Sequence, residues 1–330
     1  MKVLVAGETG AIGRPLISAL IASRLEVIGI TTTECGARTL RDRGAEAFIV
    51  DVLDRDAVEA VFRKVKPDTV IDELTSLPKE YTPEEIKAAA VRDRELRLIG
   101  GRNLQDAAIS WGARRYIAQS TGVFYAPGAG LATEGEPLAS EASPGIAGSV
   151  RTYIQIEERV LSELDLQGIA LRYGFFYGPG TSHDPATGSL ARQLRERQYP
   201  IIGSGQGVFS FVHVEDAAVA TVAALEAEPG VYNIVDDDPS DMNIWLPAFA
   251  QFLGAPAPRV ITEAEALRTA GADSIYYATR LRGASNDLAK RKLGFALRKL
   301  EWLHDAKGAL RAHPSNLTDS GAATVRRHFT

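Results

Sequence analysis

The N-terminus limits the possible folds most strongly. An apolar run over residues 1–6 predicts a buried strand, and residues 14–21 predict a helix with proline in its first turn. Gly7, Gly10 and Gly13 lie between them. A glycine turn that joins a strand to a helix exposes backbone N–H groups at the positive end of the helix dipole. This arrangement binds the pyrophosphate of a dinucleotide.

The three glycines have different predicted roles. Gly7 allows the tight turn, Gly10 lets phosphates approach the backbone, and Gly13 lets the helix pack closely on the strand. Their G-x-x-G-x-x-G spacing differs from the common G-x-G-x-x-G pattern and is weak alone. A second strand–helix unit directly behind it strengthens the prediction of a nucleotide site.

Strands and helices alternate along the first half of the chain. Strands are predicted at residues 26–31, 47–50, 69–72, 115–119 and 168–172, and helices at 37–43, 54–64, 84–108 and 156–164. Apolar strands that alternate with amphipathic helices predict an α/β fold, a Rossmann-type doubly wound parallel sheet. After residue 174 the pattern loosens, although strands at 210–214 and 231–235 and a helix at 217–226 remain recognisable.

We therefore predict three parts. Residues 1–174 form a dinucleotide-binding domain. Residues 175–304 form a smaller, mainly substrate-binding region, from which some segments return to the sheet. Residues 305–330 form a polar tail.

Composition excludes several classes of partner. The chain of 330 residues is 45% hydrophobic and carries a net charge of −5, which gives no electrostatic case for nucleic acid. No apolar run is long enough to span a membrane. The single cysteine, Cys35, excludes an internal disulfide framework and fits a reducing compartment, so we expect a cytoplasmic protein. The five histidines show no metal-binding spacing, so we expect no metal.

Six motifs occur in a fixed order: residues 7–13, 51–54, 119–125, 171–180, 211–218 and 284–295. In this order they are similar to the motifs of the extended short-chain dehydrogenase/reductases, often labelled the NAD-dependent epimerase/dehydratase family. The resemblance covers the chain to about residue 295. It implies a nicotinamide dinucleotide across the carboxyl ends of the strands and a small-molecule substrate. A homodimer is expected only by analogy with the superfamily.

The resemblance and the glycine turn together give a set of candidate cofactor contacts. These are Gly7, Thr9, Gly10, Ala11, Ile12, Gly13, Arg14, Thr32, Arg38, Asp51, Val52, Leu74, Thr75, Gln119, Tyr173, Gly174, Phe175 and Phe176.

In this fold, residues at the end of the second strand contact the adenosine ribose and distinguish a 2′-hydroxyl from a 2′-phosphate. Here that end is Thr31–Thr33, with no acidic residue to bind a free 2′-hydroxyl. The threonine hydroxyls can bond a 2′-phosphate, and Arg14 and Arg38 can supply positive charge. We therefore predict NADP(H) in preference to NAD(H), although both arginines also fit ordinary helix-surface positions.

The catalytic motif departs from the family. Relatives use Tyr-x-x-x-Lys, in which tyrosine is the general acid or base and lysine lowers its pKa and holds the nicotinamide ribose. Here Glu157 stands four residues after Tyr153. A unit charge at about 4 Å and an effective dielectric near 20 is worth roughly 4 kcal/mol, so we expect Glu157 to oppose tyrosine ionisation. In an alternative register the motif falls on Val150 and Ile154, and Tyr153 is then a half-buried helix residue.

Other side chains are candidates for the chemistry. Ser120 and Thr121 stand where relatives keep a hydroxyl that bonds the substrate oxygen, and the alternative is that they bond local backbone. Tyr125 and Tyr177, together with Tyr173, flank the expected nicotinamide pocket and are either walls or substitute acids. His183 and Phe209 complete the substrate candidates; His183 is either an acid–base group or a solvated loop residue.

Three functions follow from these residues. The first is an NAD(P)(H)-dependent oxidoreductase that transfers hydride to or from a small carbonyl, ring or alcohol with a non-standard proton donor. The second is a sugar-nucleotide epimerase or dehydratase, which depends more heavily on the Tyr/Lys pair. The third is an NAD(P)-binding regulator without turnover.

Overall fold

The computed structural model describes residues 1–78, 80, 82–294 and 296–303. Its centre is one parallel sheet of seven strands. In sheet order these are β11 (Gly230–Ile234), β6 (Gln167–Tyr173), β5 (Arg115–Thr121), β4 (Thr69–Asp72), β1 (Lys2–Ala6), β2 (Glu26–Thr31) and β3 (Glu46–Ile49). The strand order reverses beside β1, as in Rossmann-type sheets, so the predicted fold is confirmed.

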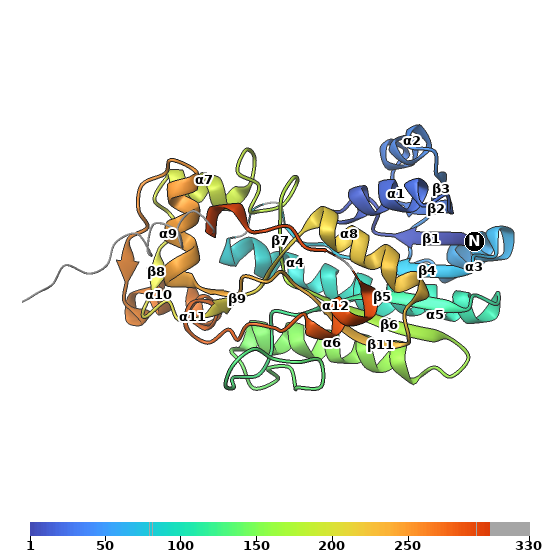
Figure 1. The fold of residues 1–330 in the computed structure, drawn as a ribbon. Helices are drawn as coiled ribbons and strands as arrows, with labels where there is room; N and C mark the ends of the chain where they lie inside the picture. The colour runs from blue at the N-terminus through green and yellow to red at the C-terminus, as the bar shows by residue number, and fades with distance from the viewer. Residues whose placement is uncertain (79, 81, 295, 304–330) are drawn as a thin grey trace, which may run out of the picture.

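Helices cover both faces of the sheet (Figure 1). One face packs on α1 (Gly13–Ala22), α8 (Val214–Ala223) and α12 (Asp287–Leu293), and α2 (Glu34–Asp42) adds Leu40 to the same cluster. The opposite face packs on α3 (Arg55–Val65), α5 (Gly101–Ser110) and α6 (Pro144–Ser162). Burial of apolar side chains on both faces explains why the strands are nearly continuous apolar runs.

Two helices differ from the sequence prediction. The predicted helix over 84–108 consists of α4 (Pro83–Glu95), a π-helical turn η1 (Leu96–Gly100) and α5. Its apolar spacing does not reveal the wider turn. Helix α6 begins at Pro144, well before the predicted start at residue 156, because Ile146 and Val150 pack against the C-terminal region.

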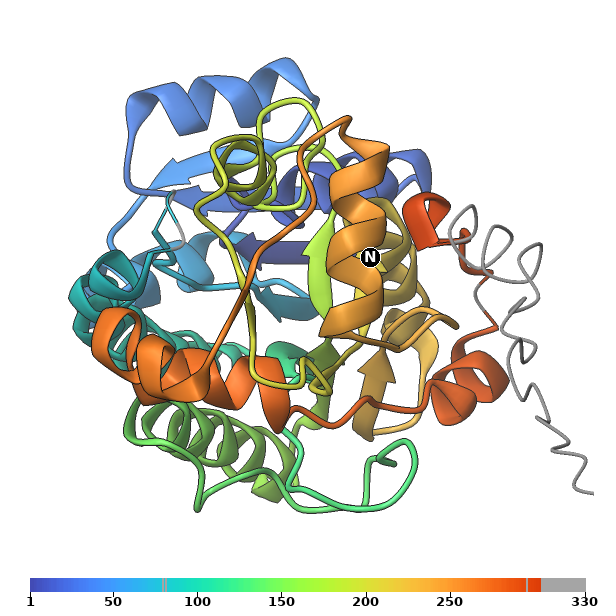
Figure 2. The same ribbon diagram turned by 90° about the vertical axis from the view of Figure 1, so that its left-hand side faces the viewer.

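The chain after β6 builds a second layer of structure at the carboxyl edge of the sheet (Figure 2). Its strands are β7 (Phe175–Tyr177), β8 (Ile201–Ile202), β9 (Val208–Phe209), β10 (Phe211–His213), β12 (Ser240–Asp241) and β13 (Val260–Ile261). Its helices are α7 (Ser189–Arg195), α9 (Met242–Phe252), α10 (Glu263–Thr269) and α11 (Gly271–Thr279). A 3-10 turn, η2 (Ala224–Glu226), follows α8, while α8, β11 and α12 pack on or pair with the central sheet.

The division at residue 174 stays a prediction, and the predicted tail, residues 305–330, lies outside the described residues. Among the described helices, none combines the length and the apolar character that a membrane span requires.

Candidate functional site

The glycine turn after β1 has the geometry that a diphosphate site requires. Gly7 has a φ of 92°, and a Cβ on Gly13 would lie 2.5 Å from the Gly7 carbonyl oxygen. The N–H of Gly10 donates to the Gly7 carbonyl at 3.1 Å, which closes the turn. Helix α1 then begins at Gly13 with no side-chain cap and no acidic residue in its first turn. The residues present therefore fit a dinucleotide pyrophosphate.

The candidate cofactor residues gather at one edge of the sheet. They lie in the last residues of β1 to β6 or in the turns and helices that follow these strands, and a parallel sheet brings the carboxyl ends of the strands to the same side. Arg14, Thr32 and Arg38 are exposed at the end expected for the adenosine, while Val52 and Leu74 are buried. Gly174 joins β6 to β11 because its N–H donates to the Ile234 carbonyl.

Glu8 is a buried acidic residue, and the sequence did not reveal its burial. It lies in the glycine turn, is 4% exposed, and its Oε1 has no hydrogen-bond partner among the described residues. Burial raises the pKa of Glu8 to about 7, opposed by hydrogen bonding to backbone and to Thr31 at the end of β2. The one feature of the sequence that could have drawn attention to Glu8 is that an acidic residue stands in a glycine turn whose predicted function does not require one.

Glu157 belongs to a buried ion pair with Arg172. The Arg172 guanidinium donates through Nε and Nη2 to the two Glu157 oxygens, each at 2.7 Å. Ser120 Oγ donates to the same carboxylate at 2.5 Å. The Ser120 hydroxyl is therefore engaged with α6 rather than free for a substrate oxygen. The charge expected to repel a tyrosinate is balanced by Arg172.

The same network holds Tyr125. Arg172 Nη1 donates to the Tyr125 hydroxyl at 2.8 Å, and that hydroxyl donates to Asn233 Oδ1 at 2.6 Å. Tyr125 is fully buried, so it joins the segment after β5 to β6 and β11 instead of lining an open pocket. This differs from its predicted place among the substrate contacts, because its hydroxyl finds partners within the chain.

Tyr153 lies where the two halves of the molecule meet. Its ring packs against two apolar clusters. One lies between the sheet and helices α3, α5 and α6, and the other is the aromatic cluster of the C-terminal region. The Arg97 guanidinium stands over the ring, 5.0 Å from the ring centroid. Burial raises the pKa of Tyr153, the charge of Arg97 lowers it, and that of Asp93 raises it. The expected effect of Glu157 on Tyr153 is thus replaced by a different pair of charges.

Thr121 and Tyr173 end neighbouring strands. Thr121 is buried, and its Oγ1 accepts the Val123 N–H at 3.3 Å. Tyr173 donates to Glu73 at 2.9 Å and lies 2.6 Å from the Thr221 hydroxyl. Burial raises the pKa of Glu73 to about 8, so this carboxyl, which the sequence did not single out, is largely protonated at neutral pH.

The remaining substrate candidates form an aromatic core. His183 is 7% exposed, and its ring lies 5.4 Å from Phe211 and 5.9 Å from Trp245. The interpretation of His183 as a solvated loop residue is wrong: burial lowers its pKa to about 4, so the ring is neutral. Tyr177, also buried, packs on His213 at 5.0 Å.

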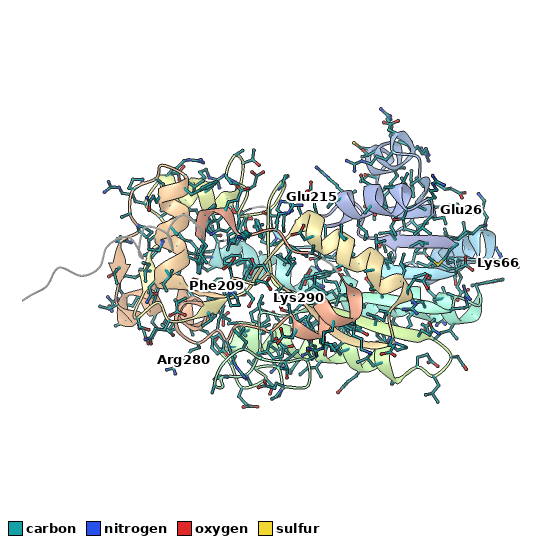
Figure 3. The ribbon with its side chains drawn as sticks, in the orientation of Figure 1. Glu26, Lys66, Phe209, Glu215, Arg280 and Lys290 are labelled. Atoms are coloured by element: carbon teal, nitrogen blue, oxygen red, sulfur yellow. The ribbon has the colours of Figure 1, made fainter. Side chains whose placement is uncertain are left out.

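Phe209 belongs to this core (Figure 3). It is 3% exposed and stacks on Phe175 at 4.6 Å, while Phe175 stays partly exposed and faces Tyr277 at 6.1 Å. Phe175 and Tyr277 are thus better placed than Phe209 to meet a substrate.

Comparison with known proteins places the chain in a family. A model described as "NAD dependent epimerase/dehydratase family" matches residues 3–235. The chain belongs to this family. It is therefore an extended short-chain dehydrogenase/reductase of the oxidoreductase or epimerase type.

Two relatives of this chain are a reductase and an epimerase. The chain is 38% identical to a 3-diazoavenalumate denitrifying reductase of a Streptomyces species over 307 residues, which cover 92% of this chain and 98% of the relative. It is 29% identical to a UDP-glucose 4-epimerase of Mycolicibacterium smegmatis over 68% of this chain and 73% of the relative.

Solved structures share the fold. The UDP-glucose 4-epimerase of Thermotoga maritima, with UDP-glucose, has a TM-score of 0.69 at 22% identity and covers 94% of this chain and 99% of its own. The Thermus thermophilus UDP-glucose 4-epimerase, in complex with NAD, has a TM-score of 0.65 at 24% identity, covering 94% and 100%.

Proposed function

We propose that this chain is an NAD(P)H-dependent reductase that adds hydride to a small, electron-poor organic molecule. The observation that carries the proposal is the similarity to the Streptomyces reductase, which extends over nearly the whole of both chains. The uncapped N-terminus of α1 and the positive φ of Gly7 support binding of the dinucleotide. When bound, that cofactor supplies the hydride.

A diazo or diazonium compound is the first substrate class to test. The name of the Streptomyces relative describes reduction with loss of nitrogen from a diazo compound. With an arene diazonium ion, a hydride forms the new C–H bond and N₂ leaves, so charge balances without an added proton. Glu157, four residues after Tyr153 where the family resemblance implies lysine, is compatible with chemistry that does not depend on a Tyr/Lys pair.

Carbonyl reduction is the second reaction within the same proposal. Here a proton must reach the oxygen as the hydride reaches the carbon. Thr121, at the end of β5, is proposed to bond that oxygen, and Tyr153 to supply the proton. Ser120 is proposed to support them indirectly, since its hydroxyl holds Glu157.

An aromatic wall favours a planar substrate. The ring centroid of Tyr277 lies 5.8 Å from that of Phe124 and 6.1 Å from that of Phe175. Phe175 and Tyr277 are partly exposed. All three pack against the same apolar cluster as Tyr153. Stacking on such a wall orients an aromatic ring without needing a charged contact.

NADP(H) remains our proposed cofactor in preference to NAD(H). The exposed arginines, Arg14 and Arg38, leave their charges accessible for a 2′-phosphate, and Thr32, directly after β2, is also exposed. The carboxyl of Glu8, near Thr31, works against a phosphate when it is ionised. Direct titration of both reduced cofactors tests the preference.

The deciding experiment offers NADH or NADPH with arene diazonium salts and with matched aromatic aldehydes. Absorbance at the reduced-nicotinamide band and mass spectrometry of the product are followed together. We expect multiple turnovers with arene formation or alcohol formation, above the rate without enzyme. Tight cofactor binding without turnover on either panel would contradict the proposal and favour a regulator.

A sugar-nucleotide epimerase is the second candidate function. The similarity to the Mycolicibacterium epimerase favours it. Conversion of UDP-glucose to its epimer without net consumption of cofactor would establish it in place of the reductase.

A further inference from the structure

Arg97 reaches Tyr153 from a distant part of the chain. It lies in the π-helical turn η1, whereas Tyr153 lies in α6. The guanidinium carbon is 5.0 Å from the centroid of the Tyr153 ring, within the range of a cation–π interaction. Arg97 is only 3% exposed, so solvent screens this charge weakly.

The position of Arg97 is fixed by other hydrogen bonds. Its Nε donates to Asp93 Oδ2 at 2.8 Å, and its Nη1 donates to Gln119 Oε1 at 3.1 Å. Asp93 in turn accepts the Thr75 hydroxyl at 2.9 Å and the Ser76 N–H at 2.7 Å. The cation is therefore tied to the segments after β4 and within β5, where cofactor contacts are predicted.

The wide turn at η1 explains how a helix presents this side chain. π-Helical turns are rare and often occur at functional sites, because the additional residue changes the direction of the side chains. The turn is closely packed: a Cβ on Gly100 would lie 2.7 Å from Val52, and one on Gly101 would lie 2.8 Å from Asp72. The helix cannot rotate freely, so Arg97 stays directed at Tyr153.

We propose that Arg97 is a positioning residue for Tyr153: it orients the phenol and stabilises the phenolate, the electrostatic role that lysine has in relatives. This inference rests on the proposed reductase function. As hydride forms the C–H bond of a carbonyl substrate, the C=O π electrons move to oxygen, which takes the Tyr153 proton. The phenolate remains beside Arg97 until water returns a proton.

The charges around Tyr153 agree with this role. Arg97 from η1 and Asp93 from α4 face it, and burial together with Asp93 raises its pKa while Arg97 lowers it. Glu157, on the same helix, is turned to Arg172. Asp72, from β4, acts on Arg97 itself. Arg97 is thus the one cation whose charge lowers the pKa of Tyr153 among the described residues.

The first test does not need a substrate. Tyr153 is replaced by 3,5-difluorotyrosine, whose phenol ionises at lower pH than tyrosine, and its ionisation is followed by absorbance. In the Arg97→Gln background we expect the apparent pKa to rise by about one pH unit, because an opposite charge is lost. Arg97→Lys, which keeps the charge, should restore most of the original value.

Arg159→Gln is the matched control. Arg159 is also partly buried in α6 and pairs with Asp72 at 3.8 Å, but it does not contact the Tyr153 ring. It should leave the phenol pKa unchanged. If Arg97→Gln does not fold by circular dichroism, Arg97→Met, which keeps an unbranched side chain without the charge, gives the same test and should raise the pKa by a similar amount. A phenol that responds to neither change overturns the proposal.

The second test uses an aldehyde that the enzyme reduces. Tyr153→Phe should lower kcat by about 10²-fold, the usual contribution of a proton donor. Arg97→Gln should lower kcat more than it raises KM and move the alkaline fall in rate to higher pH, and Arg97→Lys should recover both. If the phenol pKa responds to Arg97 but the protein reduces no carbonyl, the carbonyl reaction is overturned, whereas the electrostatic coupling of Arg97 to Tyr153 stands. Normal reduction with an unresponsive phenol would overturn the coupling alone.

Discussion

The glycine turn at residues 7–13 and the centre of α6 around Tyr153 differ in which part of the chain positions the proposed functional groups. At residues 7–13, the proposed recognition of a diphosphate depends on backbone geometry, and the glycines match the pattern of the family. Around Tyr153, charged side chains come from two elements: an anion, Glu157, follows on the same helix, and a cation, Arg97, comes from η1. The comparison teaches that backbone-based binding is preserved by a few glycines, whereas side-chain chemistry can be supplied from several elements.

The largest expected effect comes from breaking the central ion pair. Arg172→Met leaves the buried Glu157 carboxylate without its partner and should lower the free energy of unfolding by about 3 kcal/mol or more. Denaturant unfolding measures it. The double variant Arg172→Met/Glu157→Leu should recover a large part of the loss. An equally unstable double variant would mean that packing, not charge, dominates at this site.

The next effect tests the backbone site. Gly10→Asp places a carboxylate beside the expected pyrophosphate, so dinucleotide affinity should fall by about 100-fold, measured by calorimetric titration. Gly135→Asp is the control, because Gly135 is exposed and a Cβ there meets nothing within 4 Å. Equal affinities in the two variants would remove the glycine turn from cofactor binding.

A third prediction concerns pH. The folded-state pKa of Glu73 is raised from 4.5 to about 8, so the folded protein holds this proton more tightly than the unfolded chain. Stability should therefore fall as pH rises from about 4.5 to 8, because the unfolded chain loses this proton at a lower pH than the folded protein. Glu73→Gln should flatten that decline in thermal melts across pH 5–8.5. An unchanged slope would show that Glu73 is not the titrating group.

The smallest effect tests cofactor choice. Glu8→Gln removes a carboxyl near Thr31 that is about half ionised at neutral pH. We expect binding of NADPH to improve about fivefold relative to NADH, a change of about 1 kcal/mol, because a charge facing the 2′-phosphate is lost. Paired Kd measurements at pH 8 would give the largest contrast. A constant ratio would place the Glu8 carboxyl away from the adenosine ribose.

The sequence predicted the sheet and the phosphate turn because both depend on local patterns. Apolar runs define the strands, and Gly7 and Gly13 are needed where a side chain would collide with backbone. It did not predict the partner of Tyr153. The apolar spacing over 84–108 continues through η1, so the direction of Arg97 cannot be read from it. The contact between Arg97 and Tyr153 depends on tertiary packing.

Burial explains the other differences. His183 lies in a glycine-rich segment that predicts a loop, yet Phe211 and Trp245 enclose it. Ser120 and Tyr125 match family motifs, but their hydroxyls bond groups within the chain. Residue type shows what a side chain can do, and only the packed structure shows which neighbour it meets.

The pairing of Arg172 with Glu157 also limits which side chains position 157 can hold. Glu157→Lys would bring an ammonium group against the Arg172 guanidinium and take the hydrogen-bond acceptor from Ser120. A lysine at position 157 would therefore need a second substitution, at Arg172, to remove the repulsion between the two cations.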